Sequence, residues 1–131
     1  MTGSNNVAEC NSDFYLAFST GDIDLMASLW STTEESTCIH PGGGVIIGHQ
    51  DILISWQNVL ANPPDVRFFE IARNSCREFS YFTCIENLGY AKTIATNIYK
   101  QEEDGWKIIH HHGAPLYEKV NTEAVRLNSI H

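Results

Sequence analysis

The chain has 131 residues, of which 43% are hydrophobic, and its formal net charge is −8. This length fits one domain, and this composition can form a core, which excludes a disordered chain and a disulfide-dependent miniprotein. The acidic balance argues against nucleic acid or an anionic membrane as a partner, and no apolar run approaches the roughly 20 residues of a membrane span.

Two helices are predicted first, because apolar residues recur at helical spacing on both sides of Gly21. Ser4 or Asn5 can cap the first helix, and Gly21 suits the residue just after its end. Asp22 can cap a short second helix. The apolar positions are Val7, Cys10, Phe14 and Phe18 (or Ala17) in the first helix, and Ile23, Met26, Leu29 and Trp30 in the second.

The helical pattern then gives way to strands. STCIHP (36–41) and VII (45–47) predict two short strands, joined by a turn at Gly42–Gly44. A third helix is predicted from HQDILISWQNVLAN (49–62), and the two prolines that follow end it. Four strands rich in β-branched and aromatic residues complete the domain, with hairpin turns at 86–89 and 101–105; the strands are 66–74, 78–86, 90–100 and 106–112.

The predicted order, ααββαββββ, is typical of an α+β fold rather than of a parallel α/β sheet. Four strands with helices on one face would curl around those helices and leave a pocket between them. We expect one domain over residues 1–118 and a C-terminal tail over 119–131.

Three segments resemble one known family. They are similar to segments of the nuclear transport factor 2-like superfamily, and within it to the SnoaL-like, ketosteroid-isomerase-related small proteins. The three segments are FSTGDIDLMASLW (18–30), IHPGGGVIIGHQDILISW (39–56) and DGWKIIHHHGAP (104–115). The resemblance implies a cystatin-like cone, in which a strongly curved mixed or antiparallel sheet wraps the first helix around an apolar cavity. It also implies a homodimer that pairs through the outer face of the sheet. We expect no cofactor and no metal.

The catalytic residues of the steroid isomerases transfer only in part. Their carboxylate base precedes the proline of the first strand, where this chain has His40 before Pro41. Their oxyanion-binding tyrosine corresponds to Phe14, because the adjacent Tyr15 would point elsewhere on a helix. Their protonated aspartate corresponds to residue 96 or 97, Thr96 or Asn97, and neither is an acid. Steroid isomerisation is therefore not predicted.

The run His110, His111 and His112 raises the question of which ring faces inward. Side chains alternate along a strand, so Trp106, Ile108, His110 and His112 share one face and His111 lies on the other. We take the face that carries Trp106 as the inward face. The resemblance likewise implies that the histidine at the end of this strand faces the cavity. His112 would then point into the pocket, and His111 would lie on the outer face.

Three functions remain open. In an enzyme, His40 would be the general base and His112 would orient it or stabilise charge, for an isomerisation, cyclisation or dehydration of a small apolar or aromatic compound. Alternatively, the same pocket holds a ligand without chemistry, or the outer sheet face assembles dimers. The ligand contacts expected in the pocket are Phe14, Phe18, Trp30, Trp56 and His110, and the outer-face residues expected are Tyr81, Ile94, Tyr99, Ile109 and His111.

Each candidate also has a structural interpretation. The simplest interpretation of the three histidines is a polar strand end containing one buried, hydrogen-bonded ring. A zinc site would require His40, His110 and His112 together, because His111 points away. Trp30 and Trp56 also fit the core.

The N-terminal residues lack the pattern of a secretory signal, so we expect a cytoplasmic protein with reduced cysteines. The four cysteines contain no CxxC pair, and they are most simply small apolar residues. A bridge between Cys76 and Cys84 is the one disulfide that paired strands would allow.

Overall fold

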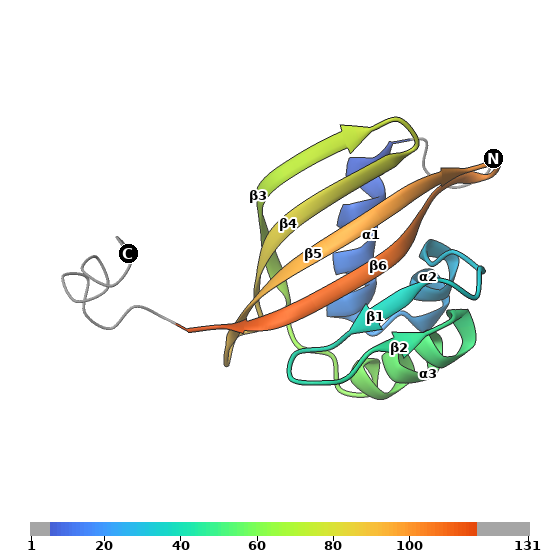
Figure 1. The fold of residues 1–131 in the computed structure, drawn as a ribbon. Coiled ribbons are helices and arrows are strands. Elements are labelled where there is room, and N and C mark those ends of the chain that lie inside the picture. Colours follow the sequence, from blue (N-terminus) through green and yellow to red (C-terminus); the bar gives the residue numbers. More distant parts are fainter. Residues whose placement is uncertain (1–5, 118–131) are drawn as a thin grey trace.

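The protein is a curved sheet of six strands that holds the first helix against its concave face (Figure 1). The computed structural model describes residues 6–117, and no helix in this part is long and apolar enough to cross a membrane. The elements are α1 Val7–Thr20, α2 Ile23–Leu29, β1 Thr37–Ile39, β2 Ile46–Ile47, α3 His49–Leu60, β3 Arg67–Cys76, β4 Phe79–Asn87, β5 Lys92–Glu102 and β6 Gly105–Leu116. The expected α+β fold and its element order are confirmed.

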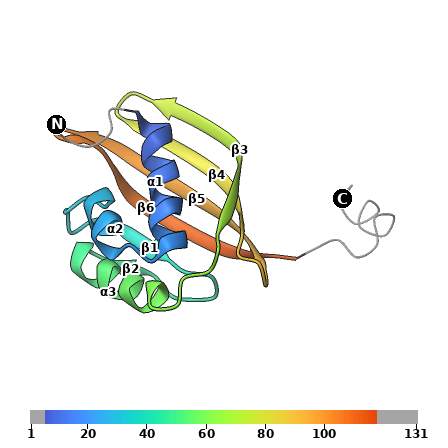
Figure 2. The same ribbon diagram turned by 180° about the vertical axis from the view of Figure 1, so that it is seen from behind.

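The sheet has the strand order β2-β1-β6-β5-β4-β3. Strand β1 pairs with β6 in parallel, whereas the other neighbours are antiparallel, so the sheet is mixed. Strands β3 to β6 cross behind α1, and α2, α3 and the short strands close the lower end (Figure 2). This arrangement is the expected cone, and no helix within residues 6–117 covers the outer face of the long strands.

The helix ends follow local capping rules. Asn6 caps α1, and its side chain accepts a hydrogen bond from the backbone N–H of Ala8 at 2.8 Å. The predicted caps Ser4 and Asn5 lie outside the described residues. Gly21 ends α1 in the left-handed conformation, with φ 72°, and Asp22 caps α2 by accepting from the N–H of Leu25 at 3.0 Å.

Helix α1 is buried over a broad arc, because the sheet curls around it instead of contacting a single stripe. The buried residues of α1 are Cys10, Asn11, Phe14, Tyr15, Ala17 and Phe18. Tyr15, which was expected to point elsewhere than Phe14 on the helix, is thus buried as well. Its ring stacks on Phe68 of β3, with ring centroids 4.3 Å apart.

One extra residue in β6 decides which histidine faces inward. Tyr99 of β5 pairs with Ile108, but the preceding Ile98 pairs with His110, so Ile109 has no partner and forms a bulge. Ile108 is buried as expected, and the bulge then shifts the alternation by one residue. His111 consequently faces the interior with 1% of its surface exposed, whereas His112 is exposed. The predicted orientations of His111 and His112 are both wrong for this reason.

The four cysteines, all within residues 6–117, form no disulfide with one another. Cys84 is buried on the inner face of β4, whereas Cys76 is exposed at the end of β3. Cys76 pairs across the sheet with Phe79, and Cys84 pairs with Glu70. The two cysteines are therefore not cross-strand neighbours in the hairpin. The predicted possibility of a Cys76–Cys84 bridge is therefore not realised.

Gly21 should be the most sensitive turn position, because it holds α1 and α2 against the end of α3. A Cβ atom at Gly21 would lie 3.1 Å from both the carbonyl oxygen of Leu60 and Cγ of Pro63, in addition to the strain of a positive φ. We expect Gly21→Ala to lower the free energy of unfolding by at least about 1–2 kcal/mol in urea denaturation.

Gly44→Ala is the matched control, because a Cβ atom there meets nothing within 4 Å. Its effect should stay within about 0.5 kcal/mol. Equal losses from the two substitutions would contradict the assignment of strain to Gly21.

Candidate functional site

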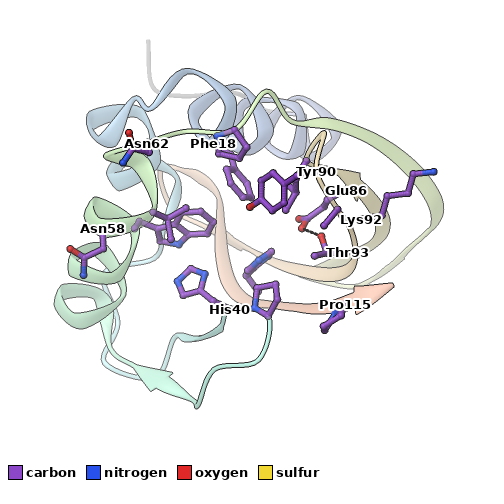
Figure 3. A pocket seen from close by; sticks show the side chains of 16 residues that line it. Phe18, His40, Asn58, Asn62, Glu86, Tyr90, Lys92, Thr93 and Pro115 are labelled. Atoms are coloured by element: carbon purple, nitrogen blue, oxygen red, sulfur yellow. Dashed lines mark hydrogen bonds between the residues drawn. The ribbon is translucent and has the colours of Figure 1, made fainter. Parts of the chain in front are cut away.

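A pocket of about 540 Å³ opens at one end of the cone, between the C-terminal end of α1, helix α3 and the ends of β4, β5 and β6 (Figure 3). Most of its wall is aromatic, aliphatic or proline, and a few polar groups converge at its floor. The lining consists of Phe18, His40, Pro41, Trp56, Asn58, Val59, Asn62, Pro64, Glu86, Leu88, Tyr90, Ala91, Lys92, Thr93, His111 and Pro115.

His40 follows β1 and lines the pocket half-buried. The hydroxyl of Ser55 donates to the carbonyl of Ile52 at 2.6 Å, so its oxygen is free to accept from Nε2–H of His40 at 2.9 Å. The sulfur of Cys38 also lies 3.7 Å from Nε2. Because the hydrogen of Ser55 goes to Ile52, we assign the hydrogen of the neutral ring to Nε2 and the lone pair to Nδ1. Burial lowers the pKa of His40 below its ordinary value, which favours this neutral form.

His111 lies deeper, where β6 crosses the floor of the pocket. Its ring packs against Phe14 and Trp56, with centroids 5.1 Å and 5.7 Å away, and its centroid lies 6.4 Å from that of His40. Nδ1 of His111 lies 2.6 Å from Oδ1 of Asn97. Burial, and then the nearby imidazoles, lower the pKa of His111 to about 3. The ring is therefore neutral throughout the physiological range.

Glu86 brings a carboxylate to the same floor, although only 2% of its surface is exposed. Tyr15 donates to one oxygen at 2.7 Å, and Thr93 donates to the other at 2.6 Å. Burial raises the pKa of Glu86, and these two hydrogen bonds oppose the rise. Figure 3 shows Glu86 beside Thr93, with Lys92 extending away from them.

A buried polar cluster connects Glu86 to His111. Nδ2 of Asn97 lies 3.0 Å from both the hydroxyl oxygen of Tyr15 and Oδ1 of Asn11. Tyr99 also donates to Oδ1 of Asn11, at 2.9 Å. Each of these groups comes from α1 or from the inner face of the sheet, and each is at most 2% exposed. These contacts give most of the polar groups in the cluster a partner where little water can reach them.

The expected ligand contacts divide into three groups. Phe18, Trp56 and the expected base His40 line the pocket. Phe14 and Trp30 are fully buried in the core and are not part of the lining. His110 is not in the pocket lining either, because its Nδ1 bonds to the hydroxyl of Thr37 at 2.7 Å on the outer side of the sheet.

The sequence interpretation missed Tyr15, Glu86, Asn97 and His111. The signal for Glu86 was available, because the alternation of Ser80, Phe82, Cys84 and Glu86 along β4 places all four on the inner face. It was overlooked because Glu86 was placed where the predicted strand 78–86 meets the predicted turn 86–89, whereas β4 continues to Asn87.

The site has no metal-binding geometry in the part of the chain that the structure describes. No group of three or more His, Cys, Asp or Glu residues within 6–117 could hold an ion. His110 and His112 lie on the outer side of β6, opposite to His40, so the zinc triad considered from the sequence does not assemble. Burial raises the pKa of Cys38 beside the pocket to about 12, so this cysteine stays a thiol and is no nucleophile.

Comparison with known proteins gives one family match and several similar folds. The family model of SnoaL-like domains matches residues 7–118. A crystal structure of a candidate dehydratase of the NTF2-like family from Streptomyces avermitilis is 29% identical, with a TM-score of 0.76 over 86% of this chain and 94% of that one. A cystatin-like domain of unknown function from Nostoc punctiforme is 13% identical, with a TM-score of 0.72 over 99% of this chain and 95% of that one, and shows the fold alone.

A curated relative is the F-box protein SKIP8 of Arabidopsis thaliana. It is 20% identical over 114 residues, which make up 84% of this chain and 49% of that protein. The chain therefore spans about half the length of this relative.

The buried neutral His111 should make the protein acid-sensitive. Its folded pKa of about 3 lies below the ordinary 6.5, so the unfolded chain binds the proton more tightly between these values. The contribution to stability is complete above pH 6.5 and is lost as the pH falls toward 3, by roughly 2 kcal/mol at pH 5. We expect His111→Phe to unfold in urea with a shallower pH dependence than the wild type between pH 6.5 and 5.

His112→Phe is the control, because that ring is exposed on the same strand. Its pH dependence should parallel that of the wild type. Parallel curves for His111→Phe and the wild type would contradict a buried neutral imidazole at position 111.

Proposed function

The chain belongs to the SnoaL-like domain family, and from this premise we propose that it binds a small, mostly apolar molecule in the pocket and moves a proton on it with His40. The observation that carries the proposal is a half-buried imidazole that lines a mostly apolar pocket and is held at Nε2 by Ser55. Family membership supports a ligand-binding or isomerase- or dehydratase-type activity.

The pocket wall favours an apolar or aromatic ligand. Phe18 and Trp56 contribute aromatic surface, and Pro41, Pro64 and Pro115 add rigid apolar surface. Small-molecule sites commonly combine such walls with a few placed polar groups that set orientation.

His40 has the properties of a general base. A neutral imidazole with a lowered pKa is already unprotonated at neutral pH, and Ser55 holds its ring through Nε2. Nδ1 can take a proton from a carbon beside a carbonyl. In a dehydration, the imidazolium would return that proton to the departing hydroxyl, so that a C=C bond forms, water leaves and His40 becomes neutral again. The similarity to a candidate dehydratase supports this choice over cyclisation or isomerisation.

A binding module without chemistry is the second candidate. His111 and Glu86 are almost completely enclosed, and such buried polar groups suit recognition as well as catalysis. A binder returns its ligand unchanged, whereas an enzyme releases a product.

Proton exchange into small ketones tests the catalytic proposal without a known substrate. The protein would be incubated in D₂O with a panel of cyclic enones and β-hydroxy ketones, and deuterium uptake beside the carbonyl followed by mass spectrometry. We expect catalysed exchange that is constant above about pH 6.5 and declines at lower pH, because the pKa of His40 is lowered. His40→Gln should reduce the exchange by at least about 100-fold.

His112→Gln should keep the full exchange rate, because this exposed ring lies outside the pocket. Exchange that persists in His40→Gln would contradict the role of His40 as the base.

The uncovered face of the sheet supports a homodimer as the assembled form. The register aligns Phe69, Ile85, Ile94 and Ala114 in a row across β3 to β6 on this face. Phe69, Ile94 and Tyr81 are exposed there, an arrangement that marks interaction surfaces. Tyr99 and His111, which were expected on this face, are buried inside the cone, so these two expectations are wrong.

A charge in the apolar row should prevent pairing. We expect Ile94→Asp to convert a dimer into a monomer in size-exclusion chromatography with light scattering, since burying an unpaired carboxylate at an interface is costly. Ile54→Asp is the control, because Ile54 is exposed on α3, away from this face. A dimer that tolerates Ile94→Asp would contradict pairing through the sheet.

A further inference from the structure

The hydrogen bonds between Glu86 and His111 have one consistent direction. Tyr15 has a single hydroxyl hydrogen, and it serves Glu86, which also accepts the hydroxyl of Thr93. The oxygen of Tyr15 is then left to accept, and it accepts Nδ2 of Asn97. Every donor in this series of hydrogen bonds therefore points toward the carboxylate of Glu86.

A second set of contacts orients Asn97 in the same way. The hydroxyl of Tyr99 donates to Oδ1 of Asn11, so that oxygen faces inward and also accepts from Nδ2 of Asn97. The other end of the Asn11 amide donates to the sulfur of Cys84 at 3.6 Å. Both sets place the amide nitrogen of Asn97 toward α1 and its oxygen toward His111.

The orientation of Asn97 determines the tautomer of His111. Oδ1 of Asn97 can only accept, so Nδ1 of His111 must carry the hydrogen of the bond between them. The ring is neutral because burial disfavours its charged form. Nε2 of His111 therefore presents a lone pair and no hydrogen.

This lone pair lies beside the pocket without a partner among residues 6–117. A Cβ atom built on Gly113 would stand 3.6 Å from Nε2 and 3.3 Å from Cγ of Pro41, and both Pro41 and His111 line the pocket. Nε2 therefore lies close to the backbone of Gly113 and to Pro41, and a side chain at position 113 would crowd this nitrogen. An acceptor in the pocket wall that has no protein partner can gain free energy from a ligand that brings a donor.

We propose that the floor of the pocket recognises a hydroxyl group, as in a phenol, an enol or an alcohol, which donates its hydrogen to Nε2 of His111. Asn97 and Tyr15 are then positioning residues that set the specificity, because they keep this nitrogen an acceptor. A ligand carbonyl would bring a lone pair against a lone pair. A ligand carboxylate would also meet the carboxylate of Glu86, and an ammonium group would lose its hydration in apolar walls.

This inference rests on the proposed ligand pocket, and a matched pair of probes tests the two separately. 2-Naphthol and 2-methoxynaphthalene have similar size and apolar surface, but only the first donates a hydrogen bond. Isothermal titration at pH 7 should give a Kd for 2-naphthol at least about tenfold lower than for the ether. His111→Phe should equalise the two values, and His112→Phe, on the exposed side of the same strand, should preserve the difference.

The tautomer can be measured in the unmodified protein, which does not depend on the stability of any variant. Long-range ¹H–¹⁵N correlation spectra of the ¹⁵N-labelled wild type should show the hydrogen of His111 on Nδ1 at all pH values from 5 to 8. Asn97→Leu removes the oxygen that holds this tautomer, so it should populate the Nε2–H form and reduce the preference for 2-naphthol.

Each outcome distinguishes the two proposals. Equal binding of both probes by the wild type, or a hydrogen found on Nε2, would overturn the hydroxyl site and leave the apolar pocket standing. Binding of neither probe would overturn the pocket proposal and the hydroxyl site with it.

Discussion

The exclusion of water from the space between α1 and the curved sheet is the constraint on which the site depends. A polar group that is buried there cannot bond to water, and one left without a protein partner costs about 1–3 kcal/mol. Asn11 and Tyr15 on α1 therefore bond to Asn97, Tyr99 and Glu86 on the sheet. The same bonds that hold the helix in the cone also orient the histidine at the pocket floor, so stability and recognition share one network.

The two imidazoles of the pocket have different surroundings, which suit them to different chemical roles. His40 is half-buried, and a hydroxyl holds its Nε2–H, so its Nδ1 can exchange a proton with a ligand. His111 is enclosed, and its Nδ1 is held by an amide, so its charged form is strongly disfavoured. A ring that resists protonation so strongly is suited to accepting a hydrogen bond and poorly suited to carrying a proton. The different roles of His40 and His111 follow from how deeply each ring is buried, because the residue type is the same.

The fold could be predicted from the sequence because the elements are long, periodic and locally capped, as at Gly21 and Asp22. The position of His40 before Pro41 and the apolar residues Phe18 and Trp56 could also be placed at the pocket. The inward histidine could not, because a β-bulge leaves no compositional mark at Ile109 and yet reverses the alternation after it. Tyr15 was misplaced because a single apolar stripe was assumed for α1, whereas a sheet that wraps a helix buries several of its sides.

The bulge in β6 has a consequence for the run of three histidines. A one-residue insertion or deletion near a bulge exchanges the inward and outward sides of the strand that follows. In most strands, such a slip would replace a functional side chain with an unrelated one. Here the neighbours of His111 are His110 and His112, so an imidazole would face the pocket after a slip in either direction. The repeated residue thus makes the chemistry of this position tolerant of length changes in the β5–β6 hairpin, a robustness that a lone histidine would lack.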